Sequence, residues 1–325
     1  MAFERTDFTR LLQRRIVEMF WENYTEVDPV WMSLFTEDKT DEPFVEKQSM
    51  LGMGDLEEKK ENEAFAYDTV SEGWPIIGSV KSFGKATAVS YELYKDSEFR
   101  NLFGDFVQQM AENYPRTRDR YFANVFNNGA LLTGTKELDG TVPGVKIDPT
   151  RGLLYDGKPL FAGVGNGHPA LMNQGQTYAN YLPLTLTLEN LNTVYDMMTI
   201  DNAYDEQGNK IVIRPDTLVV PQALRSTAMQ VLSTQYMPTS SGVSSTKINP
   251  LYKAFDIIVW PHLTDRNGWF LVERRKGLKV LNRQAPTIDV WQDDETKQFK
   301  ASIYTRYGCY ADNWRYVFAC NTPQS

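Results

Sequence analysis

The chain contains two histidines, His168 and His262, and each stands next to a proline. Neither has a second His, Cys or carboxylate beside it at the spacing of a zinc site. We therefore expect His168 to order its loop as a hydrogen-bond donor rather than to act as a catalyst. An enzyme with a pocket near His168 or His262 that no local motif reveals stays open as an alternative.

Acidic residues gather in two places, and neither has the spacing of metal ligands. The segment QDDETKQ (292–298) has paired carboxylates, but its composition is typical of a solvated turn. Asp201, Asp205 and Gly208 suggest a calcium loop, yet the glutamate needed at the twelfth position is missing. We interpret both segments as turns and predict no metal site.

Motifs for nucleotides and for activated nucleophiles are missing from the sequence as well. No Walker A loop and no G-x-S-x-G occurs. The glycines of GVGNGHP (163–169) lack the spacing of a dinucleotide-binding loop, and GVSS (242–245) stands in a flexible polar stretch. The sequence therefore predicts no catalytic residues and no cofactor.

The composition excludes several classes of protein. The 325 residues carry a formal net charge of −8, whereas a specific reader of DNA or RNA relies on cationic residues. No apolar run is long enough to cross a membrane, and the start MAFERTDFTR lacks the apolar segment of a signal peptide. Cys309 and Cys320 could form a disulfide, but we expect two reduced, buried thiols.

Helices and strands follow from the apolar spacing in the first half of the chain. An amphipathic helix is predicted at 6–24, followed by an acidic, extended arm. Residues 63–94 are strand-like around a turn in SEGWPI, which predicts a long hairpin with Trp74 at its tip. Residues 97–128 have the strongest helical pattern, in which Pro115 either kinks one helix or separates two, and Asn128-Gly129 ends it.

The second half mixes helices and strands. A helix is predicted at 187–200 and a strand at 211–220, and the segment DTLVVPQALRSTAMQVL (216–232) passes from strand to helix at Pro221. Further strands are FDIIVWP, WFLVE, GLKVLNR, TIDVWQ and the long segment that begins at Phe299. The order of elements predicts an α+β protein whose C-terminal strands return to an earlier sheet.

Four stretches of the sequence, taken in their order, resemble a known family. They are VKSFGKATAVSYELYKDSEFRNL; RYFANVFNNGALLTG followed by YDGKPLFAGVGNGHPAL; DTLVVPQALRSTAMQVL; and NPLYKAFDIIVWPHLTDRNGWFLVE. Together they resemble a tailed-bacteriophage major capsid protein of the Hong Kong 97-type fold, in the branch of the Mu-like major head subunit. The match spans roughly 80–275, with an insert-like segment after Asn128 and no Asp before the His-Pro pair.

The resemblance implies a division of the chain into five parts. These are an N-terminal helix and arm (1–61), an extended hairpin loop (62–95), a peripheral domain with a spine helix (96–160), an axial domain (161–275) and strands that return to the peripheral domain (276–325). The joint at 216–232 is then architectural, with its strand in the axial sheet and its helix covering one face. We expect no segment that is cut off before the first helix.

The implied function is that of a structural shell protein. Copies of the chain would assemble through pentamers and hexamers into an icosahedral shell, with scaffold, portal and decoration proteins as partners. Packaged double-stranded DNA would touch the inner face without sequence preference, and no membrane is involved. Assembly is expected in the host cytoplasm.

Candidate contacts between subunits come from the hairpin and from the basic run RTRDR (116–120). The simpler interpretation of this run is a helix face exposed to solvent. A patch facing an acidic partner or a packed polyanion is the functional interpretation. The candidates are Trp74, Lys81, Phe83, Lys85, Arg116, Arg118 and Arg120. No Asn partner marks a covalent crosslink, so we predict non-covalent contacts. A tail or adaptor subunit and an encapsulin-like compartment shell remain as alternatives.

Overall fold

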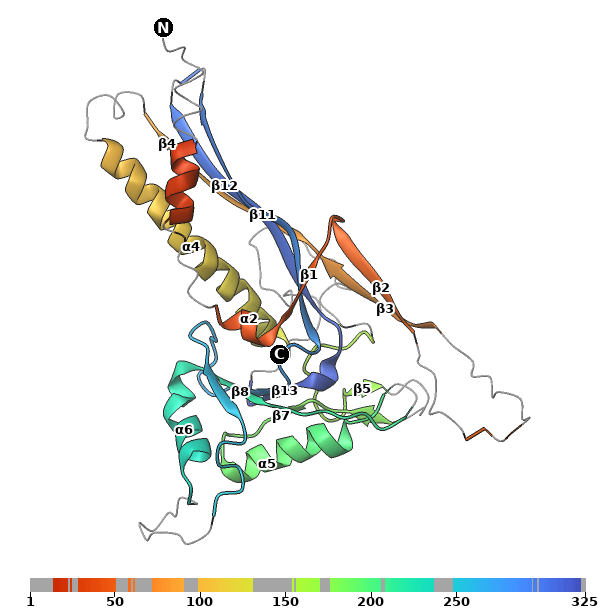
Figure 1. Ribbon diagram of the computed structural model, residues 1–325. Helices are drawn as coiled ribbons and strands as arrows, with labels where there is room; N and C mark the ends of the chain where they lie inside the picture. The colour runs from red at the N-terminus through yellow and green to blue at the C-terminus, as the bar shows by residue number, and fades with distance from the viewer. Residues whose placement is uncertain are drawn as a thin grey trace.

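The computed structural model describes residues 14–22, 24, 29–50, 58–59, 61, 72–90, 99–130, 154, 156–169, 176–205, 208–236, 248–293, 295–296 and 298–322. In these ranges the chain forms two layers of structure around two sheets (Figure 1). One layer is elongated and holds the long helix. The other is more compact and holds the helices at Leu188–Asp196 and Arg225–Ser233. The fold is α+β, as predicted.

The elongated layer consists of one long helix and a four-stranded sheet. Helix α4 (Phe99–Asn128) runs without a break through Pro115, so the first of the two predicted alternatives is right. The sheet has the order β1 (Thr36–Lys39), β11 (Leu278–Gln292), β12 (Phe299–Ala311) and β4 (Lys81–Val89). Figure 1 shows α4 lying along the long strands. The apolar stripe predicted from the sequence faces this sheet, with Val107, Phe122 and Phe126 buried.

Residues 14–22 are helical and pack on the half of the elongated layer that lies away from the compact layer (Figure 1). Ile16 and Phe20 are buried in one cluster with Val107 and Met110 of α4 and Ile288 of β11. These contacts confirm the apolar stripe for this part of the predicted helix. Its first turns, before residue 14, lie outside the described residues.

A short helix closes the near end of the elongated layer. Helix α2 (Val30–Leu34) places the Trp31 ring centroid 4.8 Å from that of Phe122, and Phe35 lies 5.5 Å from the same ring. Trp31 and Leu34 are fully buried. Aromatic residues make up 13% of the sequence, and the rings of Trp31, Phe35 and Phe122 are used in the subunit's own core, where each large ring removes much apolar surface from water.

The compact layer is built on a five-stranded sheet. Its order is β7 (Tyr181–Leu182), β13 (Val317–Cys320), β10 (Trp269–Val272), β8 (Thr217–Val220) and β9 (Asp256–Val259). All four residues of β8, β10 and β13 are buried, so both faces of the sheet are covered. The core that includes α4 covers one face, and helices α5 (Leu188–Asp196) and α6 (Arg225–Ser233) cover the other.

The joint at 216–232 is confirmed in detail. Strand β8 ends at Val220, Pro221 precedes the short 3₁₀ turn η2 (Gln222–Leu224), and α6 follows at once. Leu218 and Val220 pack in one cluster with Ala228, Val231 and Leu232 of the helix. The α5 helix also matches its prediction and continues as the π turn η1 (Met197–Asp201). Short pieces complete the layer: β5 (His168–Pro169), β6 (Thr177–Tyr178) and η3 (Trp314–Tyr316).

The predicted hairpin is wrong in its pairing. The segment SEGWPI (71–76), predicted as the turn, falls largely within β3 (Glu72–Ser79), which pairs antiparallel with β2 (Phe44–Met50) from the predicted arm. The second predicted strand, 78–94, begins within the end of β3 and contains β4, which pairs with β12. The physical reason is that period-two alternation identifies a strand but not its partner. The segment 63–70, proposed as the first hairpin strand, lies outside the described residues.

Three further strand predictions need correction. GLKVLNR and TIDVWQ are one strand, β11, with irregular register between Asn282 and Thr287. The strand expected at 211–220 spans only β8. The C-terminal strands divide between the layers, because β12 returns to β4 as expected whereas β13 joins β10 in the compact layer. The turn at Asp312 and Asn313, held by the Gly277 carbonyl, separates them.

Candidate functional site

Strands β2 and β3 form a separate two-stranded ribbon. Figure 1 shows it projecting from the elongated layer on the side opposite α4. Its base is anchored by Ile76, which packs with Leu281 and Tyr310. Beyond this base, a two-stranded ribbon has little apolar surface to bury in its own chain and is marginally stable alone in water. Trp74, the predicted contact residue, lies within β3 rather than at a turn.

The three candidates on β4 have different surroundings. The Phe83 ring stacks on Tyr307 at 4.3 Å between centroids and meets the edge of Tyr121 at 5.0 Å. Its contacts are therefore inside the chain. Lys81 is partly buried, and Lys85 is exposed on the same face of the strand.

The three arginines of α4 also separate. Arg118 makes cation–π contacts with two rings. Its guanidinium carbon lies 4.6 Å from the Trp31 ring centroid and 5.2 Å from that of Tyr307. Its Nη2 donates to Asn282 Oδ1 at 2.8 Å. Arg116 donates to Asn113 one turn earlier, and both Arg116 and Arg120 are exposed. The structure thus places Arg118 inside the packing of the chain and the other two on the helix surface.

A groove of about 260 Å³ lies between α4 and the sheet strands β4 and β12. Phe106 and Met110 contribute apolar surface from the helix, and Ile303 does so from β12. Lys85 stands at its edge. The groove is an accessible apolar surface next to exposed cations, which is the usual anatomy of a protein contact rather than of a catalytic centre.

His168 is fully buried, and both of its ring nitrogens and one face of its ring have close neighbours. Its Nδ1 lies 2.6 Å from Asp156 Oδ2 and its Nε2 lies 3.3 Å from Asn180 Oδ1. The ring stacks on Trp314 with centroids 4.2 Å apart. This agrees with the prediction of a loop-ordering residue. The missing Asp before the His-Pro pair is supplied by Asp156, twelve residues earlier in the chain.

Asn180 is the central residue of this cluster, and sequence reasoning missed it. Its Oδ1 accepts the Ala162 N–H at 2.8 Å, and its Nδ2 donates to the carbonyls of Leu160 at 2.7 Å and Val317 at 3.1 Å. It therefore ties the loop before β5 to β13. A lone Asn carries no sequence signal for this role, whereas the Asp-Gly pair at 156–157 could have marked Asp156 as a turn residue.

His262 belongs to a second cluster around a buried acid. Asp119 accepts the Trp260 Nε1–H at 2.9 Å and the Trp31 backbone N–H at 3.3 Å, and His262 Nε2 lies 3.8 Å away. Burial raises the pKa of Asp119 above its ordinary value, and these hydrogen bonds oppose the shift. The acid links α4 to α2 and to the turn after β9, which is a structural task.

The acidic segment 292–298 forms a turn as predicted, closed by the Asp293 N–H donating to the Gln298 carbonyl at 2.9 Å. Asp293 pairs with Lys300 and accepts the Glu295 N–H at 3.0 Å, and the Lys300 contact lowers the pKa of Asp293 to about 2. Within the described ranges, no three His, Cys, Asp or Glu side chains gather as a metal site would need. None of the helices that the structure describes combines the length and hydropathy needed to cross a bilayer. Cys309 and Cys320 are not joined in a disulfide; Cys320 is buried and Cys309 is half-buried.

The sequence matches one family model, described as phage capsid protein, over residues 75–320. A search of curated protein sequences finds no match. Solved structures with the same fold include Microbacterium phage Oxtober96, with 12% identity, a TM-score of 0.52 and coverage of 99% of this chain and 100% of the other.

Two further structures extend the comparison. Mycobacterium phage Patience has 11% identity and a TM-score of 0.56, covering 99% of this chain and 89% of the other. The capsid of a native GTA particle has 10% identity and a TM-score of 0.53, covering 90% and 89%. At these sequence identities the solved structures show only that the fold is shared. The sequence evidence for the family comes from the family model.

Proposed function

The chain belongs to the phage capsid protein family, and from this premise we propose that its copies close through pentamers and hexamers into an icosahedral shell around double-stranded DNA. It is a major capsid protein of phage heads with the Hong Kong 97-type fold, and its place is the virion capsid. The observation that carries the proposed mode of assembly is the β2–β3 ribbon. It projects from the body and needs a neighbouring surface to cover it.

The proposed contact between copies pairs surfaces of opposite charge. Lys85 of β4 and Arg116 and Arg120 of α4 are exposed on the elongated layer. Exposed acids lie in β1, in the segment after it and at the start of β2. They are Glu37, Asp41, Glu42 and Glu46. A head-to-tail contact between these faces is heterologous and can close around a symmetry axis. Charge complementarity would set its register and suppress wrong pairings.

Apolar contact area is available on the compact layer as well. Val212 is 67% exposed, and the bridged pair Tyr236 and Ile248 is 53% and 72% exposed. We propose that this layer is the axial domain, which meets its copies around the five-fold and six-fold axes. The elongated layer with α4 is then the peripheral domain, and the β2–β3 ribbon is the extended loop. Trp74 on the ribbon is proposed to contact a neighbour.

The remaining parts of the proposal concern partners. A net charge of −8 keeps the wall from holding DNA tightly, so we propose weak contact without sequence preference on the inner face. Scaffold, portal and decoration proteins are proposed as helpers, with assembly in the host cytoplasm and non-covalent contacts between copies. We propose no enzymatic activity, since the two histidines serve packing clusters.

Sedimentation velocity at several concentrations, with electron micrographs of each peak, tests the proposal. The wild type is expected to form pentamers, hexamers or closed particles. The Lys85→Glu and Arg120→Glu double variant should keep its thermal stability and lose assembly by at least about tenfold in association constant. The matched control is Arg266→Glu, an exposed arginine on the compact layer. Rings or tubes would favour a tail or adaptor subunit, and assembly unaffected by the double variant would refute the charged contact.

A further inference from the structure

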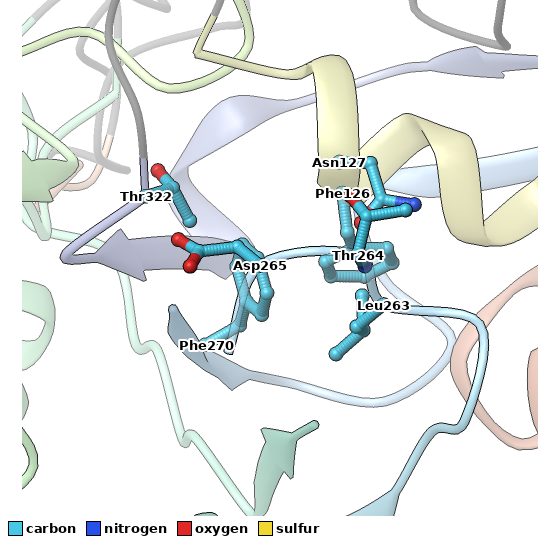
Figure 2. Close-up of a pocket in the computed structure, with 7 residues that line it drawn as sticks. All are labelled: Phe126, Asn127, Leu263, Thr264, Asp265, Phe270 and Thr322. Carbon is cyan, nitrogen blue, oxygen red and sulfur yellow. Dashed lines mark hydrogen bonds between the residues drawn. The ribbon is translucent and has the colours of Figure 1, made fainter. Parts of the chain in front are cut away.

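A second cavity lies where the two layers meet, and nothing in the assembly proposal uses it. Its volume is about 290 Å³. It is formed by the C-terminal end of α4, the segment between β9 and β10, and Thr322 just after β13 (Figure 2). These three pieces are far apart in sequence, so no local motif could have predicted the cavity.

One wall of the cavity is apolar. Phe126 comes from α4, Leu263 follows β9, and Phe270 belongs to β10. The centroids of the Phe126 and Phe270 rings are 5.0 Å apart in an edge contact, which fixes the wall. A hydrocarbon chain of a ligand would be sheltered from water against these side chains.

The opposite side carries a carboxylate and a hydroxyl. Figure 2 shows the Asp265 carboxylate on the side toward Thr322. Asp265 Oδ1 accepts the Asn267 N–H at 3.0 Å, and its other oxygen has no hydrogen-bond partner among the described residues. Thr322 is only 5% exposed, and its Oγ1 is also without a partner in the described part of the chain. A buried hydroxyl left unpaired is costly unless a ligand or water satisfies it.

The neighbouring polar groups are already occupied. Asn127 Oδ1 accepts the Thr264 N–H at 2.9 Å, and its Nδ2 donates to the His262 carbonyl at 3.1 Å. Tyr181 donates its hydroxyl to the Thr322 carbonyl at 2.8 Å. These bonds hold the walls in place. Asp265, Thr322 and the hydroxyl of Thr264 are the other polar groups of the lining, and of the two threonines Thr322 is the buried one.

The electrostatic environment favours a cation. The lining contains one carboxylate and no Lys, Arg or His. The cavity also lies at the C-terminal end of α4, where the helix dipole presents its negative end. Burial raises the pKa of Tyr181, and the nearby charge of Asp265 adds to this shift, so the carboxylate acts electrostatically inside this region.

We propose that this cavity binds an organic cation of the alkylammonium class, with the ammonium on Asp265 and Thr322 and the hydrocarbon against Phe126, Leu263 and Phe270. A bare divalent ion fits poorly, because Ca²⁺ takes six to eight oxygen ligands and one carboxylate stands here. The same chemistry is found in a lysine side chain of another copy and in a free polyamine. The site itself does not depend on the proposed assembly.

Titration of the unassembled, full-length chain tests the site, with binding followed by calorimetry. The probes are n-butylamine and 1,4-diaminobutane, which are cations at neutral pH, and 1-butanol as the neutral analogue. One equivalent of amine should bind, and butanol should bind at least about tenfold more weakly, as expected when a charge-assisted hydrogen bond is lost. Asp265→Asn should weaken amine binding by at least about tenfold, and Thr322→Val by a smaller factor.

The control is Asp289→Asn, which removes an exposed charge on β11 away from the cavity and should change nothing. Equal affinity for butanol and butylamine, unchanged binding by Asp265→Asn, or no saturable binding up to about 50 mM would overturn the proposal. Repeating the titration on assembled particles separates the two sources. Binding that persists indicates a free amine, and binding lost only in particles indicates a lysine of a neighbouring copy. A chain that fails to assemble contradicts the proposed function and leaves the site test intact.

Discussion

Replacing Asn180 should destabilise the subunit more than almost any other polar substitution, because its side-chain amide serves three backbone groups at 2.7–3.1 Å and a fourth, the Trp314 carbonyl, at 3.3 Å. Asn180→Ala leaves the Ala162 N–H and the carbonyls of Leu160 and Val317 without the partners at 2.7–3.1 Å that they have now. Asn180 is 1% exposed, so bulk water cannot replace the lost bonds freely. At roughly 1–1.5 kcal/mol per bond, the free energy of unfolding should fall by about 3–5 kcal/mol.

Asn180→Asp separates hydrogen bonding from size. The carboxylate has the same shape and can still accept the Ala162 N–H, but it cannot donate to the two carbonyls. It also places a charge where the carbonyl oxygens converge, so the loss should be at least as large as in Asn180→Ala. A stability ranking in which Asp is better than Ala would contradict this reasoning about donors.

The assay is urea unfolding of the unassembled chain. The urea midpoint of each variant is compared with that of the wild type, with the dependence of the free energy on urea concentration held constant. A loss of about 3–5 kcal/mol corresponds to a midpoint lowered by roughly 1 M or more at the slopes usual for chains of this size. Asn190→Ala is the matched control, since Asn190 donates one half-exposed bond to the Thr185 carbonyl at 2.8 Å and should cost under about 1 kcal/mol. A loss below about 1 kcal/mol in Asn180→Ala would refute the claim that this amide ties the loop to β13.

Three other predictions follow from single sites. Phe83→Ala should lower the free energy of unfolding by about 2–4 kcal/mol, measured by urea unfolding, because the stacked contact with Tyr307 is lost. An unchanged urea midpoint together with impaired assembly would instead show that Phe83 contacts another subunit. Burial raises the pKa of Asp119 above its ordinary value of 3.8, so the folded state binds this proton more tightly and the free energy of unfolding falls as pH rises above that value. The free energy of unfolding of the wild type minus that of Asp119→Asn should therefore become smaller between about pH 4 and about pH 6, and an increase in this difference would contradict the sign. Burial also raises the pKa of the Cys320 thiol, so iodoacetamide should label Cys309 first in the native chain, and labelling abolished in Cys320→Ser rather than Cys309→Ser would contradict this order.

The shell function places particular demands on the subunit. A capsid subunit must keep its two layers in a fixed relation while its projecting parts reach other copies. The clusters around Asp119 and Asn180 meet the first demand, since each joins segments from different parts of the chain near the contact of the layers. The β2–β3 ribbon meets the second. Rigid joints and extended contacts allow modest interactions, repeated around every subunit, to hold a shell together.

Local signals were sufficient for the elements whose apolar pattern repeats with one period. The apolar pattern at 97–128 predicted the helical segment and Asn128-Gly129 predicted its end, and the structure has one helix, α4, that ends at Asn128 with Pro115 inside it. The joint at 216–232 was readable because a fully buried strand, a proline and a helical pattern follow one another without a gap. The family resemblance then joined these elements into the correct fold.

Pairing and side-chain partners were decided only by the tertiary structure. β4 pairs with β12, more than 200 residues later, and the adjacent β3 turns instead to β2. Arg118 looked like a surface cation in RTRDR, yet the rings of Trp31 and Tyr307 cover it. A residue's neighbours in the sequence fix its backbone preference. Which distant segment covers it depends on long-range contacts, whose free energy is gained only when the whole chain has closed.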